Sequence, residues 1–146
     1  MVTTQSMTDR RYEFFEHTAD IGAHVYGAML PELFQNAAQA MFTALGELHK
    51  TDVRDEKPVE IEAGTIEDLL HDWLAELLYE VEANHVLYDD MDLTVEPGKL
   101  TALLRGAEID FANSQTNEEI KAVTYHQLRV EQLPDRTWRA TVIFDV

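Results

Sequence analysis

The sequence predicts a single α+β domain, in which a mixed β-sheet packs against two α-helices. Apolar residues recur at helical spacing in two early segments, 31–45 and 66–81. Most of the second half alternates apolar and polar residues, as strands do. The length of 146 residues suits one hydrophobic core and is short for two.

The chain begins with a polar lead-in and two short predicted strands. Residues 1–11, MVTTQSMTDRR, lack the apolar segment of a signal peptide, so we expect a disordered lead-in before a domain that spans residues 12–146. Strands are predicted at 12–16 and 21–27, because apolar residues alternate with other residues in the second of these segments. The segment HTAD, residues 17–20, would connect them.

Two amphipathic helices follow. The first starts near Pro31 and ends at Gly46, and its apolar face consists of Leu33, Phe34, Ala37, Ala38, Met41, Phe42 and Leu45. The second starts after Thr65, which forms a capping pair with Asp68, and its apolar face is wide enough to wall the core. Between the helices, the polar residues 49–58 predict a loop, with a short strand around Val53 as an alternative, and residues 59–63 predict a strand.

The remaining chain predicts strands at 85–96, 100–109, 121–131 and 137–145. The segments EPGK and LPDRT have the composition of hairpin turns. In the last strand, Trp138, Ala140, Val142 and Phe144 share one side. Ile143 interrupts the polar side, so we expect part of that face to be covered as well.

Composition excludes several classes of function. The formal net charge of −17 repels phosphate backbones, and the basic residues are scattered, so we expect no direct binding to nucleic acid; basic proteins and cations are the expected partners. The absence of cysteine excludes disulfides, thiolate zinc sites and cysteine nucleophiles. Because no apolar run is long enough to span a bilayer, we expect no membrane association and a cytoplasmic location.

The end of the chain could supply a metal site. Asp145 offers a carboxylate and Val146 a terminal carboxylate, and Asp20 would add another if its turn lies beside them. Calcium prefers such oxygen ligands. From the pattern alone, a solvated or backbone-capping aspartate remains the competing interpretation, and His17 is a turn histidine or a ligand. The acidic run at residues 89–92 lacks the glycine and glutamate of an EF-hand, so we interpret it as a solvated strand edge.

Two further groups of polar residues have structural and functional interpretations. Asp68, His71, Asp72, Glu76 and Glu80 lie on the polar side of the second helix, and we interpret them as a solvated face because no nucleophile accompanies them. Lys121, Thr124, Tyr125 and His126 occupy a predicted strand. They form either ordinary cross-strand pairs or a docking edge for a partner.

Four segments together resemble the archease family: FEHTADIG, LLHDWLAELLYE, EIKAVTYH and the terminal IFDV. They occur in the family's order, and the resemblance covers residues 12–146. It implies a non-enzymatic accessory protein of the RtcB-type tRNA-splicing RNA ligase, which promotes ligase guanylylation and multiple turnover.

The resemblance also implies particular residues. A divalent cation, usually calcium, would be held by Asp20, Asp145 and the terminal carboxylate or main-chain oxygen of Val146. His17, Lys121, Thr124 and His126 would support this site or contact the partner.

A metal-dependent phosphoester hydrolase and a general chaperone for RNA-modifying enzymes are the alternative functions.

Overall fold

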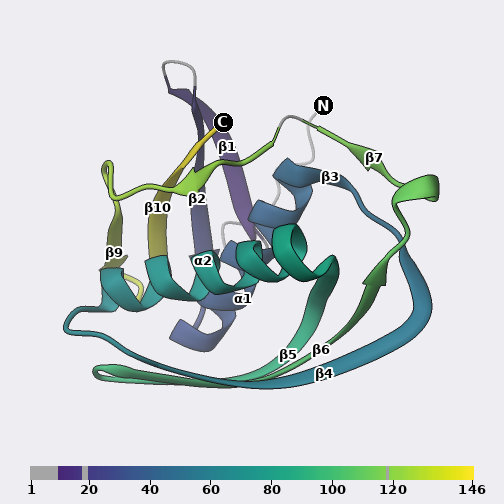
Figure 1. Ribbon diagram of the computed structural model, residues 1–146. Coiled ribbons are helices and arrows are strands. Elements are labelled where there is room, and N and C mark those ends of the chain that lie inside the picture. The colour runs from purple at the N-terminus through teal and green to yellow at the C-terminus, as the bar shows by residue number, and fades with distance from the viewer. Residues whose placement is uncertain (1–9, 18–19, 118) are drawn as a thin grey trace.

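Two helices lie between two antiparallel β-sheets in the computed structural model, which describes residues 10–17, 20–117 and 119–146 (Figure 1). The five-stranded sheet has the order β1-β2-β10-β8, with β9 also pairing with β10. Its strands are β1 (Tyr12–His17), β2 (Asp20–Gly27), β8 (Ala122–Val123), β9 (Arg129–Gln132) and β10 (Trp138–Asp145).

A three-stranded sheet of order β4-β6-β5 covers the opposite side of the helices (Figure 1). Its strands are β4 (Lys50–Glu62), β5 (Val86–Glu96) and β6 (Lys99–Ile109). A third, two-stranded sheet pairs β3 (Gly46–Glu47) with β7 (Gln115–Thr116), and a 3₁₀ turn, η1 (Phe111–Asn113), precedes β7.

Both predicted helices are confirmed. Helix α1 (Leu30–Leu45) has a proline in its first turn and ends where the N–H of Gly46 donates to the carbonyl of Phe42. Helix α2 (Ile66–Asn84) begins at Thr65, whose side-chain oxygen accepts a hydrogen bond of 3.1 Å from the N–H of Asp68. This bond satisfies one of the N–H groups that a helix start leaves unpaired.

The core forms where the helices pack on each other and on both sheets. Trp73 of α2 is fully buried, and its indole N–H donates to the carbonyl of Phe34 in α1 at 3.0 Å. Ile143, on the otherwise polar side of β10, is also fully buried, which confirms the expectation that this face is partly covered. No helix in the described part of the chain is long and apolar enough to cross a membrane.

The α+β class and the two helices are confirmed, but the single mixed sheet is corrected. Every strand pairing between described residues is antiparallel, and the strands divide among three sheets. Short connections join β1 to β2 and β5 to β6, and such connections can join only antiparallel neighbours.

The predicted loop at 49–58 is wrong, because these residues form most of β4. The alternation that marks a half-buried strand is missing here, since this part of the strand is largely exposed. Pairing with β6 holds it instead, from Arg54 opposite Ala107 to Pro58 opposite Leu103, and the ammonium of Lys50 adds an ion pair with the carboxylate of Asp89 at 2.9 Å.

The predicted continuous strand at 121–131 is also wrong, because a turn separates β8 from β9. Gln127 has a positive φ of 53°, a left-handed conformation that interrupts a strand. The hydroxyl of Thr124 accepts a hydrogen bond from the N–H of His126 at 3.2 Å, which tightens the start of the turn.

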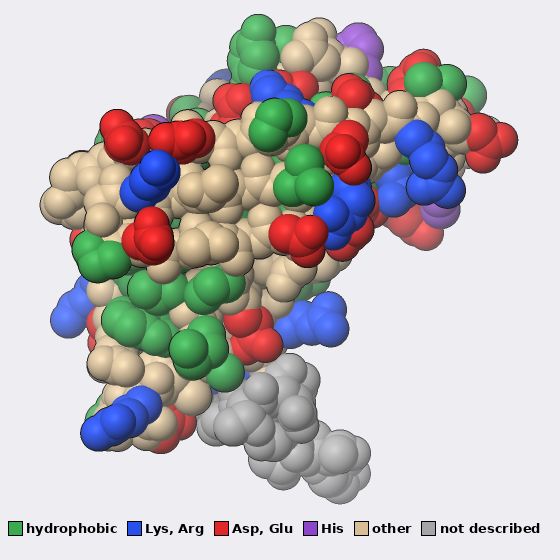
Figure 2. Space-filling model, turned by 90° about the horizontal axis from the view of Figure 1, so that it is seen from below, with side chains coloured by type: hydrophobic (Ala, Val, Ile, Leu, Met, Phe, Trp, Pro, Cys, Tyr) green, Lys and Arg blue, Asp and Glu red, His purple; other side chains and the backbone are tan. Residues whose placement is uncertain are grey.

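The acidic run at 89–92 lies in β5 and is neutralised by basic neighbours. The guanidinium of Arg105 donates to the carboxylates of Asp90 at 2.8 Å and Asp92 at 2.9 Å. Acidic and basic side chains interleave over the face seen in Figure 2, which views the molecule from the side of the three-stranded sheet. These aspartates therefore act in ion pairs at a solvated sheet face.

Candidate metal centre and docking edge

The candidate metal ligands lie in one row across the five-stranded sheet. Asp20 pairs with His17 of β1 on one side and with Asp145 of β10 on the other, and Asp145 pairs with Ala122 of β8. Directly paired residues point to the same face of a sheet. The register therefore places the side chains of His17, Asp20 and Asp145 on one face, although Asp20 and Asp145 are far apart in sequence.

This row contains two carboxylates and one unsatisfied imidazole nitrogen. Nδ1 of His17 is buried and makes no hydrogen bond within the described residues; it lies 3.4 Å from a carboxylate oxygen of Asp20. Like charges placed directly opposite each other destabilise a sheet. A cation near Asp20 and Asp145 would reduce this repulsion.

The side chains alone do not complete a metal site. Among the residues that the structure describes, no three His, Asp or Glu side chains are grouped so as to hold an ion. Val146 is partly buried and packs against the hydrophobic core, which fixes the backbone next to Asp145. A complete oxygen site would thus need further oxygen ligands, and the resemblance implies that Val146 supplies one of them.

The segment that contains β8 is attached to the same end of β10. The N–H of Lys121 donates to the carbonyl of Asp145 at 2.7 Å. The N–H and the hydroxyl of Thr124 both donate to the carbonyl of Ile143, at 3.0 and 2.9 Å. Two of the predicted docking residues therefore lie beside the carboxylate row.

The side chains of this segment differ in their surroundings. Lys121 is exposed and forms no ion pair with any described residue, so its charge is open to a partner. His126 is also exposed. Tyr125 is 59% exposed as well, but its ring stacks on that of His71 in α2 with the centroids 4.0 Å apart.

His71 fastens the β8 segment to α2. Its Nε2 lies 2.9 Å from the carbonyl oxygen of Val123, and its Nδ1 lies 3.0 Å from the carboxylate of Asp72. Both ring nitrogens thus face oxygen atoms, and these two contacts hold the imidazole ring between α2 and the β8 segment. His71 was expected on a solvated helix face, and its contact with the backbone of Val123 left no signal in the sequence.

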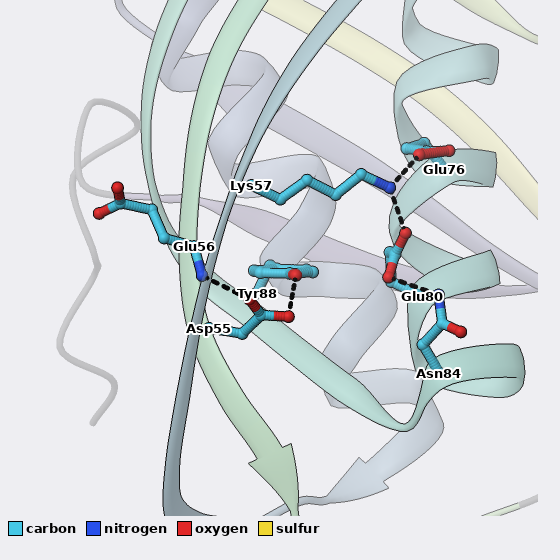
Figure 3. A network of polar contacts seen from close by, with 7 residues as sticks. All are labelled: Asp55, Glu56, Lys57, Glu76, Glu80, Asn84 and Tyr88. Carbon is cyan, nitrogen blue, oxygen red and sulfur yellow. Dashed lines mark hydrogen bonds and ion pairs between the residues drawn. The ribbon is translucent and has the colours of Figure 1, made fainter.

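Glu80 also departs from the predicted solvated face, because it is 3% exposed. Figure 3 shows its carboxylate between the ammonium of Lys57 and the side-chain amide of Asn84, which donates to it at 2.9 Å. Lys57 also donates to Glu76 at 3.1 Å. The hydrogen bond to Glu80 raises the pKa of Lys57 above its ordinary value, and burial opposes this effect.

A neighbouring pair completes the network in Figure 3. The hydroxyl of Tyr88 donates to the carboxylate of Asp55 at 2.8 Å. Burial and this carboxylate raise the pKa of Tyr88 above its ordinary value. Because these side chains join α2 and β5 to β4, we assign the network to stability, since a buried carboxylate requires partners.

The fold and the carboxylate row define a small acidic α+β protein whose terminal strand carries the candidate site. The family model of the archease protein family matches residues 12–146. The chain belongs to the archease family, which confirms the resemblance in its motifs.

Relatives and solved structures agree with this assignment. The chain is 35% identical to protein archease of Pyrococcus abyssi over 141 residues, which cover 94% of this chain and 99% of that protein. It is 37% identical to protein archease of Methanosarcina mazei over 142 residues, which cover 94% of this chain and 97% of that protein.

Two solved structures resemble the fold. The solution structure of Methanobacterium thermoautotrophicum protein 1598 has a TM-score of 0.71 and 27% identity and covers 92% of this chain and 98% of that one. The second is the crystal structure of an archease from Thermotoga maritima, which is described as a possible chaperone. It has a TM-score of 0.65 and 26% identity, and it covers 90% of this chain and 94% of that one.

Proposed function

We propose that this chain is a non-enzymatic activator of an RtcB-type RNA ligase, and that it promotes ligase guanylylation and multiple turnover. Membership in the archease family supports this proposal. The observation that carries it is the register of Asp20 with Asp145 beside the exposed Lys121. This arrangement presents the two carboxylates and the ammonium of Lys121 at one edge of the sheet, where β2 begins and β10 ends.

The same edge would hold a divalent cation, and we propose that this cation is calcium. Asp20, Asp145 and Val146 supply the oxygen ligands that calcium prefers, with water completing the coordination. Nδ1 of His17, which has no hydrogen-bond partner among the described residues, lies 3.4 Å from a carboxylate oxygen of Asp20 and would orient that carboxylate. When bound, the cation would offset the repulsion between the two aspartates and make the edge rigid.

The charge of the chain fits an accessory role for an enzyme that binds RNA. A net charge of −17 favours basic surfaces and disfavours RNA itself. An acidic activator would therefore dock on the basic surface of the ligase and leave it between catalytic rounds. Lys121, Thr124 and His126 would contact the ligase from the docking edge.

A multiple-turnover ligation assay tests this proposal. The purified cognate ligase is given excess RNA ends, GTP and a divalent cation, with and without this chain. We expect product to exceed one equivalent per ligase only when the chain is present. Equal yields with and without it would refute the proposal, whereas loss of stimulation on adding one residue after Val146 would support the role of its carboxylate.

A general chaperone is the second candidate, because the similar structure from Thermotoga maritima is described as a possible chaperone. That function predicts protection of unrelated proteins from aggregation. It also predicts that EDTA and Asp20→Asn have no effect. Protection of a standard client, such as citrate synthase during heating, would distinguish the two functions.

A further inference from the structure

A groove lies where α2 ends beside β3, η1 and β7; Figure 1 shows how α2, β3 and β7 are arranged. It has a volume of about 360 Å³. Leu45, Leu48, Val81 and Phe111 supply its apolar lining, and Glu82 and Glu119 supply two carboxylates. Residues from three separate parts of the chain, around β3, the end of α2 and the η1–β7 segment, thus form one concave surface.

The groove leaves apolar surface open to water. Leu45 and Val81 are buried and belong to the edge of the core. Phe111 is 46% exposed, and its ring meets His85 in an edge-on contact with the centroids 5.3 Å apart. A flat aromatic surface therefore stands at the side of an apolar floor.

The two carboxylates at this groove are not neutralised. Neither Glu82 nor Glu119 forms an ion pair with a basic residue in the described ranges. Partial burial and the charge of Glu119 raise the pKa of Glu82 above its ordinary value. A cation entering the groove would relieve this repulsion.

We infer that the groove binds a lysine- or arginine-bearing segment of a protein partner. These side chains combine a long apolar stem with a charged head, which matches an apolar floor beside two carboxylates. An arginine or lysine can also lie over the face of Phe111. The carboxylates repel phosphate, so the occupant is a polypeptide and not RNA.

The identity of the partner rests on the proposed function: it is the basic surface of the RNA ligase. A second attachment point, in addition to the Asp20 and Asp145 row, would fix the orientation of the chain on the ligase. Charged contacts of this kind set specificity and speed of association.

Binding of the full-length chain to the purified ligase tests this inference. The groove variant is Glu82→Gln/Glu119→Gln. The matched control is Glu62→Gln/Glu96→Gln, which removes the same charge from exposed positions of the three-stranded sheet. Phe111→Ala removes the aromatic surface. Thermal melting verifies that each variant is folded.

We expect the groove pair and the Phe111 variant each to weaken ligase binding about fivefold, as for loss of one or two charge-assisted or aromatic contacts. The control should change binding less than twofold. Groove variants that bind like the wild type, or a control that weakens binding equally, would overturn the inference.

A peptide probe separates this inference from the proposed function. If the wild-type chain binds the ligase without stimulating it, the proposed function fails, and the variants still decide the role of the groove. If the wild type does not bind the ligase, NMR titration with acetyl-Leu-Arg-Leu-Arg-amide decides. Shifts at groove amides that disappear in the groove variant support the inference, and their absence overturns it.

Discussion

Replacing Asp20 by asparagine should change stability in opposite directions with and without calcium. Without a cation, Asp20 and Asp145 are like charges directly opposite each other, a pairing that costs about 0.2–1 kcal/mol. The side chain of Asp20 is 19% exposed, so water screens part of this repulsion. We therefore expect Asp20→Asn to raise the free energy of unfolding in EDTA by about 0.5 kcal/mol.

With calcium, the same substitution should remove a ligand. A cation at a hundred times its Kd stabilises the folded wild type by about 2.7 kcal/mol. For a chain near this length, that corresponds to a rise in Tm of roughly 5–11 °C. The variant should lose most of this rise, so the wild type becomes the more stable protein.

Thermal unfolding followed by circular dichroism at pH 7 measures both effects. Asp52→Asn is the matched control, because Asp52 is an exposed aspartate in β4 of the other sheet. The control should keep the full calcium-dependent rise in Tm. An equal rise in wild type and Asp20→Asn would refute the reasoning, as would a large loss of stability in EDTA.

Three other substitutions test the structure around the site. Lys57→Met leaves the Glu80 carboxylate buried without its cation and should lower the free energy of unfolding by about 2–3 kcal/mol, measured by urea unfolding at pH 7. The pKa of Lys57 is raised in the folded protein, so its contribution to stability is complete at neutral pH. This contribution is lost only as the pH rises above 10.5. His71→Phe keeps an aromatic ring but removes the imidazole contacts with Asp72 and Val123, so it should cost about 1–2 kcal/mol and speed amide exchange at Thr124. Gly106→Ala would place a Cβ 1.9 Å from a carbonyl oxygen of the neighbouring strand and should lower stability by about 1–3 kcal/mol in the same urea assay.

Sequence pattern predicted the elements whose residues have one buried face. Both helices and the last strand show such a face, and their bounds agree closely with the structure. The first half of β4 has no such face, and its pairing with β6 is not visible in local sequence. The break between β8 and β9 depends on the left-handed Gln127, which the alternation of residues 121–131 did not reveal.

The candidate site was only partly predictable. Asp20 and Asp145 were identified from the resemblance and from the position of Asp145 in the last strand, and their register came from the fold. The groove at Glu82 and Glu119 was not detectable in the sequence, because the residues that line it come from separate elements. The contact of His71 with Val123 was hidden for the same reason, since a backbone carbonyl leaves no mark in a sequence.

The rate of ligase guanylylation tests the central claim most directly. The purified ligase is incubated with labelled GTP and calcium, and the covalent guanylate is measured over time with wild type, Asp145→Asn or the Asp52→Asn control. The proposed function predicts that wild type and control accelerate guanylylation and that Asp145→Asn does not. Equal acceleration by Asp145→Asn, or none by the wild type, would contradict it.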